Sequence, residues 1–379
     1  MLTEAQSMVQ AMARQFARER LWPTAAERDR TCQPPLDLLR EMGDLGLMGM
    51  CVPEEWGGAG TDFVSYVLAI EEVAAGDGAV STIMSVNNSP VCAAIQTYGT
   101  EDQKQRFLQP LARGEQIGAF ALTEPQAGSD AAAIQTRALD QGDRFLLSGA
   151  KQFITSGSIA SCALVFAVTD PDLGKGGMSC FVVPTSEPGW KVTRLEQKLG
   201  QHCSDTCQVA LDDLAVTPDL MLGRRGDGYR IALANLESGR VGIGAQAVGM
   251  ARSAFDAALD YARQRETFGK PIVEHQAVAF RLADMATGVE AGRQLVLNAA
   301  RLKDARQPCL KEASMAKLFA SEMAERVCSD AIQVHGGYGY VAGFPVERIY
   351  RDVRVCQIYE GTSDVQRIVI SRALGAGSR

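Results

Sequence analysis

The stretch Cys162-Ala163-Leu164-Val165-Phe166-Ala167-Val168 decides how this chain of 379 residues is organised. It is short and apolar throughout, and it contains valine and phenylalanine, features that predict a buried strand. Similar runs lie at Phe145–Leu147, Cys180–Val183 and Gln208–Leu211, with clusters of turn-forming residues such as Gly174–Gly177 between them. Several short strands at such spacing predict a small sandwich or barrel rather than βαβ units.

Residues with high helix propensity lie on both sides of this strand region. Residues 1–118 are rich in Ala, Leu, Met, Glu and Arg, and Pro- or Gly-bearing breaks divide them into helices of ordinary length. After residue 222 the helices become longer: Val278, Leu282, Met285 and Val289 recur at helical spacing. We therefore predict an α+β fold. Its three domains are an N-terminal helical domain (1–118), a central β-barrel-like domain (119–222) and a C-terminal helical domain (223–379).

Composition excludes several classes of protein. With 46% apolar and 22% charged residues the chain can bury a large core, which excludes disordered and fibrous classes. The net charge is −7 and no basic block occurs, so a role in nucleic-acid binding is not expected. No apolar stretch is long enough to span a membrane, and the first residues lack the features of a secretion signal or a transit peptide. We therefore expect a cytoplasmic protein.

The ten cysteines are scattered and never form a C-x-x-C pair. The tightest pair is Cys203-x-x-x-Cys207, with His202 beside it. A zinc site requires paired clusters at ligand spacing, so we predict reduced, mostly buried cysteines and no metal site.

Two segments near the strands could contact a ligand. Ala121–Asp130 contains Pro and Gly for a tight turn and offers the hydroxyls of Thr123 and Ser129, which could hold a polar ring edge or a phosphate. A purely structural turn explains it equally well. In Lys151–Gly157, Phe153 and Thr155 share one face of a strand and could form a platform for a flat heteroaromatic cofactor, whereas the alternative is a core phenylalanine.

Two further segments carry charge. Arg263–Lys270 follows a helix, where its positive charge either compensates the helix dipole or binds a diphosphate. In Gln357–Ser363, Glu360 lies between apolar residues and a Gly-Thr-Ser turn, in which Thr362 or Ser363 can cap a helix that starts near Asp364. Partial desolvation would raise the pKa of such a carboxylate toward that of a general base, whereas the alternative is a surface glutamate. No glycine-rich nucleotide fingerprint is present.

Taken in order along the chain, these segments resemble the acyl-CoA dehydrogenase family. The matching motifs cover essentially the entire chain; they are Ala121–Asp130, Arg265–Lys270, His275-Gln276, Gln333–Gly339, and Ile358–Ser363 with Gln366-Arg367. The resemblance implies a helical domain, a β domain and a C-terminal four-helix bundle, in a homotetramer that binds FAD and an acyl-CoA substrate.

The family's reaction is α,β-dehydrogenation of an acyl-CoA to the trans-2-enoyl-CoA. Glu360 matches the base that removes the α-proton, while flavin N5 accepts the β-hydride. In the family, the backbone N–H of the base and a flavin ribityl hydroxyl hold the thioester oxygen. Some relatives place the base just before the arginine that Arg240 matches, but Gly239 stands there in this chain. The base is therefore assigned to Glu360, with Glu237 as a second candidate.

The resemblance also implies which residues contact the ligands. The cofactor contacts are Phe120, Leu122, Thr123, Gly128, Ser129, Phe153, Ile154 and Thr155 near the flavin; Arg265, Thr267, Phe268, His275 and Gln276 on the diphosphate and adenine side; Gln333, Val334, His335, Gly336 and Gly337 at the FAD of a neighbouring subunit; and Thr362, Ser363 and Asp364 at the closing turn. The substrate contacts are Ser129, Glu237, Arg240 and Gly361. The family typically has Trp at the position of Phe153, and Glu or Gln at that of Asp364.

Three stretches look most like short-chain members: Ile83–Ser89, Leu302–Asp304 and Lys311–Lys317. They favour a butyryl-like or short branched acyl group, with an electron-transferring flavoprotein as the acceptor. Two alternatives are an oxygen-using oxidase on the same scaffold and a non-catalytic helical assembly protein.

Overall fold

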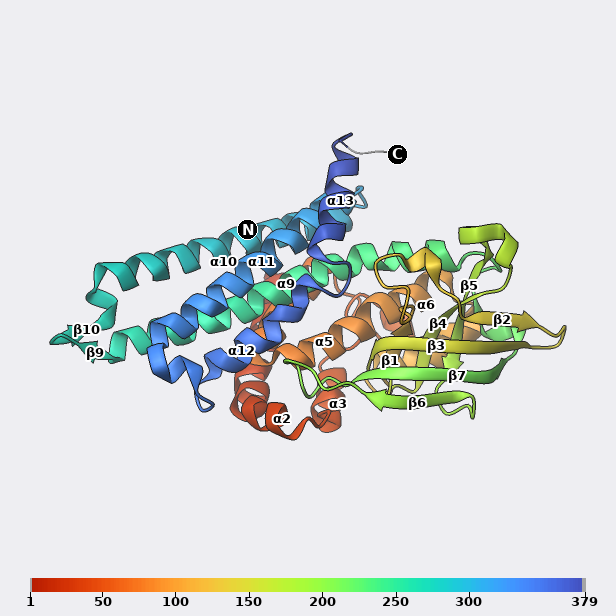
Figure 1. Ribbon diagram of the computed structural model, residues 1–379, viewed down its shortest axis with the longest axis horizontal. Helices are drawn as coiled ribbons and strands as arrows, with labels where there is room; N and C mark the ends of the chain where they lie inside the picture. The colour runs from red at the N-terminus through yellow and green to blue at the C-terminus, as the bar shows by residue number, and fades with distance from the viewer. Residues whose placement is uncertain (1, 377–379) are drawn as a thin grey trace.

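The computed structural model describes residues 2–376, which form three successive regions (Figure 1). The first region contains short helices, joined in places by single π-helical or 3-10 turns. Its α-helices are α1 (Glu4–Phe16), α2 (Ala25–Thr31), α3 (Leu36–Asp44), α4 (Phe63–Gly76), α5 (Gly78–Val86), α6 (Ala93–Tyr98), α7 (Glu101–Gln103) and α8 (Gln109–Ala112).

Polar side chains fix where these helices begin. Thr3 and Gln6 form a capping box at α1, and the Asp77 carboxylate accepts the backbone N–H groups of Ala79 and Val80 at the start of α5. Asp77 also holds Arg28 of α2 through a buried ion pair of 2.7 Å. The cap of one helix therefore also fixes its packing against another.

The middle region contains one eight-stranded sheet in the order β6-β7-β3-β2-β4-β5-β8, with β1 paired to β4. The strands are β1 (Gly118–Ala121), β2 (Arg137–Asp140), β3 (Phe145–Thr155), β4 (Cys162–Val168), β5 (Met178–Pro184), β6 (Trp190–Leu195), β7 (Thr206–Val216) and β8 (Met221–Leu222). All four predicted runs lie in strands, and the run that defined the fold is β4 itself. Its side chains are buried from Cys162 through Ala167, as expected for an inner strand.

Long helices follow the sheet: α9 (Gly228–Gln264), α10 (Gln276–Asp304), α11 (Leu310–His335), α12 (Pro345–Val353) and α13 (Ser363–Ala373). A hairpin of β9 (Glu266–Thr267) and β10 (Lys270–Pro271) joins α9 to α10. The predicted face of α10 is confirmed, because Leu282, Met285 and Val289 are buried. The predicted stop is also confirmed: α11 ends at His335, and Gly336 follows with φ +60°.

The first and last regions share one hydrophobic core, whereas the sheet forms a second core together with α6, α8 and the start of α9. The α+β architecture expected from the sequence is therefore confirmed. The 37 residues of α9 run from the sheet to the far end of the helical part (Figure 1). No helix among residues 2–376 is both long and apolar enough to cross a membrane.

The cysteines and the metal prediction can also be compared with the structure. All ten cysteines are free, and eight of them are buried. Within the described residues no group of three or more His, Cys, Asp or Glu side chains is arranged to hold a metal ion.

Candidate active site

Glu360 lies in the turn between a 3-10 segment (Arg354–Gln357) and α13. Its φ is +56°, and that of Gly361 is +88°. Such an angle strains a non-glycine residue, and strain of this kind collects at functional sites. The turn ends where the Thr362 hydroxyl accepts the backbone N–H of Val365 at 3.3 Å, so the predicted cap of α13 is Thr362.

The Glu360 carboxylate faces α9, where Gly239 leaves room for it. Oε2 of Glu360 is buried and has no hydrogen-bond partner. A Cβ added to Gly239 would lie 2.5 Å from this oxygen, inside van der Waals contact. A side chain at position 239 would therefore displace the end of the Glu360 side chain.

Two buried cations lie close enough to influence this carboxylate. Burial raises the pKa of Glu360 to about 7, although the charges of Arg240 on α9 and Lys317 on α11 act to lower it. Arg240 is only 6% exposed, and its Nε has no partner. The result is a carboxylate whose pKa suits a general base near neutral pH.

A cavity of about 280 Å³ lies against the stretch of α9 that directly precedes Gly239. Its walls come from α4, α6, α9 and the π-helical turn Asn87–Cys92. Ser238 and Tyr66 both line the cavity. Ser238 directly precedes Gly239, and the pKa of Tyr66 is raised by burial and, to a smaller extent, by the charge of Glu360. The buried Ser89 hydroxyl also belongs to the wall and has no partner. The cavity can therefore offer hydrogen bonds to a ligand that reaches Glu360.

A buried polar network lies directly before Glu360 in the sequence. The Tyr359 hydroxyl donates to Oε1 of Gln246 on α9. Nε2 of Gln246 donates to Oγ1 of Thr82 at 2.6 Å, and this hydroxyl donates to Oε1 of Gln201 at 2.6 Å. These side chains fill the space between α5, α9 and the Glu360 turn.

The two predicted segments near the strands lie together. The backbone N–H of Gln152 donates to the Thr123 carbonyl at 2.9 Å, so the first loop runs beside the end of β3. The buried carboxylate of Glu124, a residue of this loop, accepts a hydrogen bond from Nζ of Lys151 at 2.8 Å. This contact anchors the loop to β3. A bulge in β3 at this point gives Phe153 a φ of +57°.

The bulge turns Phe153 away from the core. The Phe153 side chain is 64% exposed, whereas the adjacent Ile154 is 1% exposed and Thr155 is half-buried. The alternative of a core phenylalanine is therefore wrong, and an exposed aromatic platform is available. Phe120 on β1 is half-buried and packs against Phe166, Leu122 at the start of the loop is buried, and Gly128 and Ser129 are exposed.

The remaining predicted cofactor residues lie at the other end of the molecule. At the β9–β10 hairpin, the His275 ring lies 3.3 Å from the Thr267 hydroxyl and edge-on to the 97% exposed Phe268. Nearby, at the end of α11, His335 stacks on Tyr261 of α9. Figure 1 places this hairpin far from the sheet. Arg265, Gln276, Gln333, Val334, Gly336 and Gly337 belong to the same end, so one chain does not bring the two predicted groups together.

Several predicted residues have other neighbours. Glu237 accepts a hydrogen bond from Cys309 at 3.4 Å, and Asp364 is exposed and paired with Arg367. Ser363 has a buried hydroxyl without a partner. Sequence reasoning gave no role to Lys317, which is fully buried beside Glu360. The sequence did contain a signal for Lys317: it is a lysine between Ala316 and Leu318 on a helix with an apolar face.

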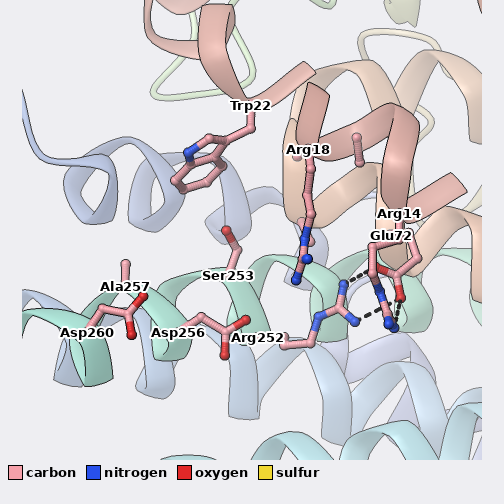
Figure 2. Close-up of a pocket in the computed structure, with 12 residues that line it drawn as sticks. Arg14, Arg18, Trp22, Glu72, Arg252, Ser253, Asp256, Ala257 and Asp260 are labelled. Carbon is pink, nitrogen blue, oxygen red and sulfur yellow. Dashed lines mark hydrogen bonds and ion pairs between the residues drawn. The ribbon is translucent and has the colours of Figure 1, made fainter. Parts of the chain in front are cut away.

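A second cavity of about 320 Å³ lies between α1, α4 and α9, away from Glu360. Figure 2 shows Arg14 and Arg252 converging on Glu72 at its edge. Arg14 donates to Glu72 at 2.8 Å, and Gln10 donates to the same carboxylate at 2.9 Å. Both oxygens of the Glu72 carboxylate therefore have partners, unlike Oε2 of Glu360, whereas Asp256 also lines this cavity and its pKa is raised by burial.

The fold and the site define a class: an α+β protein with a carboxylate oxygen that is buried without a partner between its long helices and the turn before α13. Three family domains match the chain: the Acyl-CoA dehydrogenase N-terminal domain over residues 3–115, the middle domain over 119–214 and the C-terminal domain over 226–375. The chain belongs to the acyl-CoA dehydrogenase family. Its members are FAD-dependent oxidoreductases that act on CH–CH bonds.

Individual relatives match over nearly the whole chain. An acyl-CoA dehydrogenase of Bacillus subtilis is 47% identical over 100% of both chains. The bovine mitochondrial short-chain specific acyl-CoA dehydrogenase is 45% identical over 98% of this chain and 90% of its own. Butyryl-CoA dehydrogenase from Megasphaera elsdenii superimposes with a TM-score of 0.97, 41% identity and 99% coverage of both chains. A structure described as the electron transferring flavoprotein of Acidaminococcus fermentans has a chain with a TM-score of 0.97, 45% identity, and coverage of 99% and 98%.

Proposed function

We propose that this protein α,β-dehydrogenates a short-chain acyl-CoA with Glu360 as the base. The observation that carries the proposal is the Glu360 carboxylate itself: one oxygen is buried without a partner, and its pKa is raised to about 7. A base with this pKa can take up a proton from a weak carbon acid near neutral pH.

The chain's own groups would handle the proton and the developing charge. Glu360 removes the α-proton, and we expect its backbone N–H to hold the thioester oxygen as enolate charge develops. Gly361, with φ +88°, allows the close backbone approach that this contact needs. Arg240 and the unpartnered Ser89 hydroxyl are the side chains we assign to the acyl-CoA, because both are buried and have unused donors.

The residues present fit FAD. Phe153 offers an exposed aromatic face with the Thr155 hydroxyl beside it, and the nearby Ser156 hydroxyl is buried without a partner. The flavin would supply the acceptor for the β-hydrogen. We assign the isoalloxazine side to the Thr123 loop and to Phe153–Thr155, and we expect Thr362–Asp364 to close the site.

We further propose that a second copy of the chain completes the FAD site, in a homotetramer. The support is the separation in Figure 1: the sheet-side residues and the hairpin-side residues (Arg265–Gln276 and Gln333–Gly337) lie at opposite ends of one chain. One cofactor can meet both groups only across an interface between copies.

The polar network of Tyr359, Gln246 and Thr82 supports the preference for a short acyl chain. These side chains are hydrogen-bonded to one another and fill the space beside the Glu360 turn. We propose that the network closes the inner end of the acyl site, so that a longer chain would have to displace these side chains and leave their polar atoms unpaired. We therefore expect Gln246→Ala to shift the preferred substrate toward longer acyl chains relative to the wild type.

We propose an electron-transferring flavoprotein as the acceptor and the cytoplasm as the location. Support for the acceptor comes from the structural match to a chain in an electron transferring flavoprotein structure. Support for the location comes from the ten unpaired cysteines, which suit a reducing compartment.

One experiment tests the function. The purified protein is examined for a flavin spectrum and mixed, without oxygen, with acyl-CoAs of graded length. We expect flavin bleaching that is fastest with short chains. A protein that cannot take up FAD, or a flavin that no acyl-CoA reduces, contradicts the proposal. Rapid turnover with peroxide release on admitting oxygen would favour the oxidase instead.

A further inference from the structure

Lys317 is a buried lysine on α11 to which the proposed reaction gives no role. Its side chain is fully inaccessible to solvent, and its neighbours Ala316 and Ala320 are buried as well. Burying an ammonium group is costly unless it is paired, so its partners show what the charge does.

The Lys317 ammonium holds the backbone of the Glu360 turn. Nζ donates to the Gly361 carbonyl at 2.7 Å, and Nε2 of Gln366 donates to the same oxygen at 2.8 Å. Gln366 is also fully buried. Two donors therefore fix the Gly361 carbonyl, one residue after Glu360, whose φ of +56° must be held by its surroundings.

The same ammonium also lies in the electrostatic environment of the Glu360 carboxylate. Lys317 and Arg240 both lower the pKa of Glu360, against the larger effect of burial. Burial lowers the pKa of Lys317 to about 8. The other titratable groups that act on this cluster are Glu237 on α9, Tyr66 on α4 and Cys356 before the turn. At about pH 7.5 the charged form of each group therefore predominates.

We propose that Lys317 is a positioning residue that fixes the Gly361 carbonyl in the Glu360 turn and, through its buried charge, keeps the Glu360 carboxylate ionised. The inference rests on the proposed role of Glu360 as the base. It assigns two separable tasks to one side chain: a hydrogen bond, which other donors can replace, and a charge, which only a cation can supply.

Substitutions of Lys317 separate the two tasks. Lys317→Gln keeps a donor and removes the charge, Lys317→Met removes both, and Lys317→Arg keeps the charge. The rate of flavin reduction by a short acyl-CoA is measured against pH. We call the fall of this rate at low pH the acid limb of the profile. We expect the pH of the acid limb to rise by about one unit or more in the Gln and Met variants, and to return toward the wild-type value in the Arg variant.

Lys311→Met is the matched control, because it removes a partly exposed lysine from the same helix. We expect its acid limb to coincide with that of the wild type. A uniform loss of rate in Lys317→Gln, with the limb unmoved, would mean that the lysine is only structural and would overturn the proposal. An unchanged profile would overturn it as well.

A second readout does not depend on activity. Thermal unfolding midpoints are compared for Lys317→Gln, Glu360→Gln and the double variant at about pH 7.5 and about pH 5. We expect the two substitutions to be coupled only at the higher pH, where Glu360 is ionised. Additive effects at both values would contradict the proposal. If no acyl-CoA reduces the wild-type flavin, the proposed function fails, while this cycle still tests the Lys317–Glu360 contact.

Discussion

Glu72 and Glu360 are both enclosed by protein, but their surroundings shift the pKa of the two carboxyl groups in opposite directions. Glu72 on α4 accepts hydrogen bonds from Arg14, Arg252 and Gln10 (Figure 2). Burial alone would raise its pKa, but the arginines lower it to about 2. Glu360 has two cations nearby, yet its Oε2 has no hydrogen-bond partner and its pKa is raised to about 7.

The difference shows that burial alone does not make a carboxylate reactive. At Glu72, direct hydrogen bonds from guanidinium groups stabilise the ionised form, and the carboxylate joins α1, α4 and α9. At Glu360 one oxygen is left free, so the ionised form is less stable and the carboxylate can accept a proton. We therefore regard Glu72 as a structural residue and Glu360 as the functional one.

The largest expected effect is that of Glu360→Gln. The amide cannot accept the α-proton, so we expect flavin reduction to fall by several orders of magnitude while FAD is retained. Stopped-flow absorbance measures the rate, and the visible spectrum measures the cofactor. Glu237→Gln tests the second candidate for the base and should retain much more flavin reduction than Glu360→Gln. Near-normal reduction in Glu360→Gln would place the base elsewhere.

Glu72→Gln should affect stability instead. It leaves Arg252 and Arg14 without their carboxylate, which we expect to cost about 3 kcal/mol of unfolding free energy. Because the pKa of Glu72 is lowered from 4.5 to about 2, this contribution is full above pH 4.5 and is lost as the pH falls toward 2. Denaturant unfolding at several pH values measures it. The exposed Arg20–Glu41 pair gives the control, and an equal loss in Glu41→Gln would refute the distinction.

Gly239→Ala tests the space beside Glu360. The added Cβ would displace the end of a flexible side chain, so we expect normal folding and flavin reduction slowed by about tenfold to a hundredfold. Gly244→Ala, on the same helix but facing Val296, should leave the rate of flavin reduction nearly unchanged. Equal rates in the two variants would show that the fit at Gly239 does not matter.

The smallest expected effect is the change in the rate of flavin reduction for each unit of pH. Since the pKa of Glu360 is raised to about 7, the ionised fraction falls about tenfold for each pH unit below that value. We expect the rate of flavin reduction to follow this fraction and to level off above about pH 7. Single-turnover rates across this range measure it, and a midpoint near 4.5, the ordinary glutamate value, would contradict the assignment.

Much of the molecule could be predicted from the sequence because the signals are local. The apolar run Cys162–Val168 predicted a buried strand, the spacing from Leu282 to Val289 predicted one face of α10, and Gly336 predicted the end of α11. The motif around Glu360 resembled a family signature, and the family is confirmed. The boundaries at 118/119 and 222/223 and the ligand-contact residues stay predictions.

The tertiary structure decided what depends on contacts between distant segments. Local reading left Glu360 open between a base and a surface residue, and Phe153 between a platform and the core. Packing against Gly239, 121 positions earlier in the chain, leaves one Glu360 oxygen without a partner, and a bulge turns Phe153 outward. Lys317 was not identified from the sequence for the same reason. Periodicity and propensity act over a few residues, whereas burial and charge depend on which helices meet.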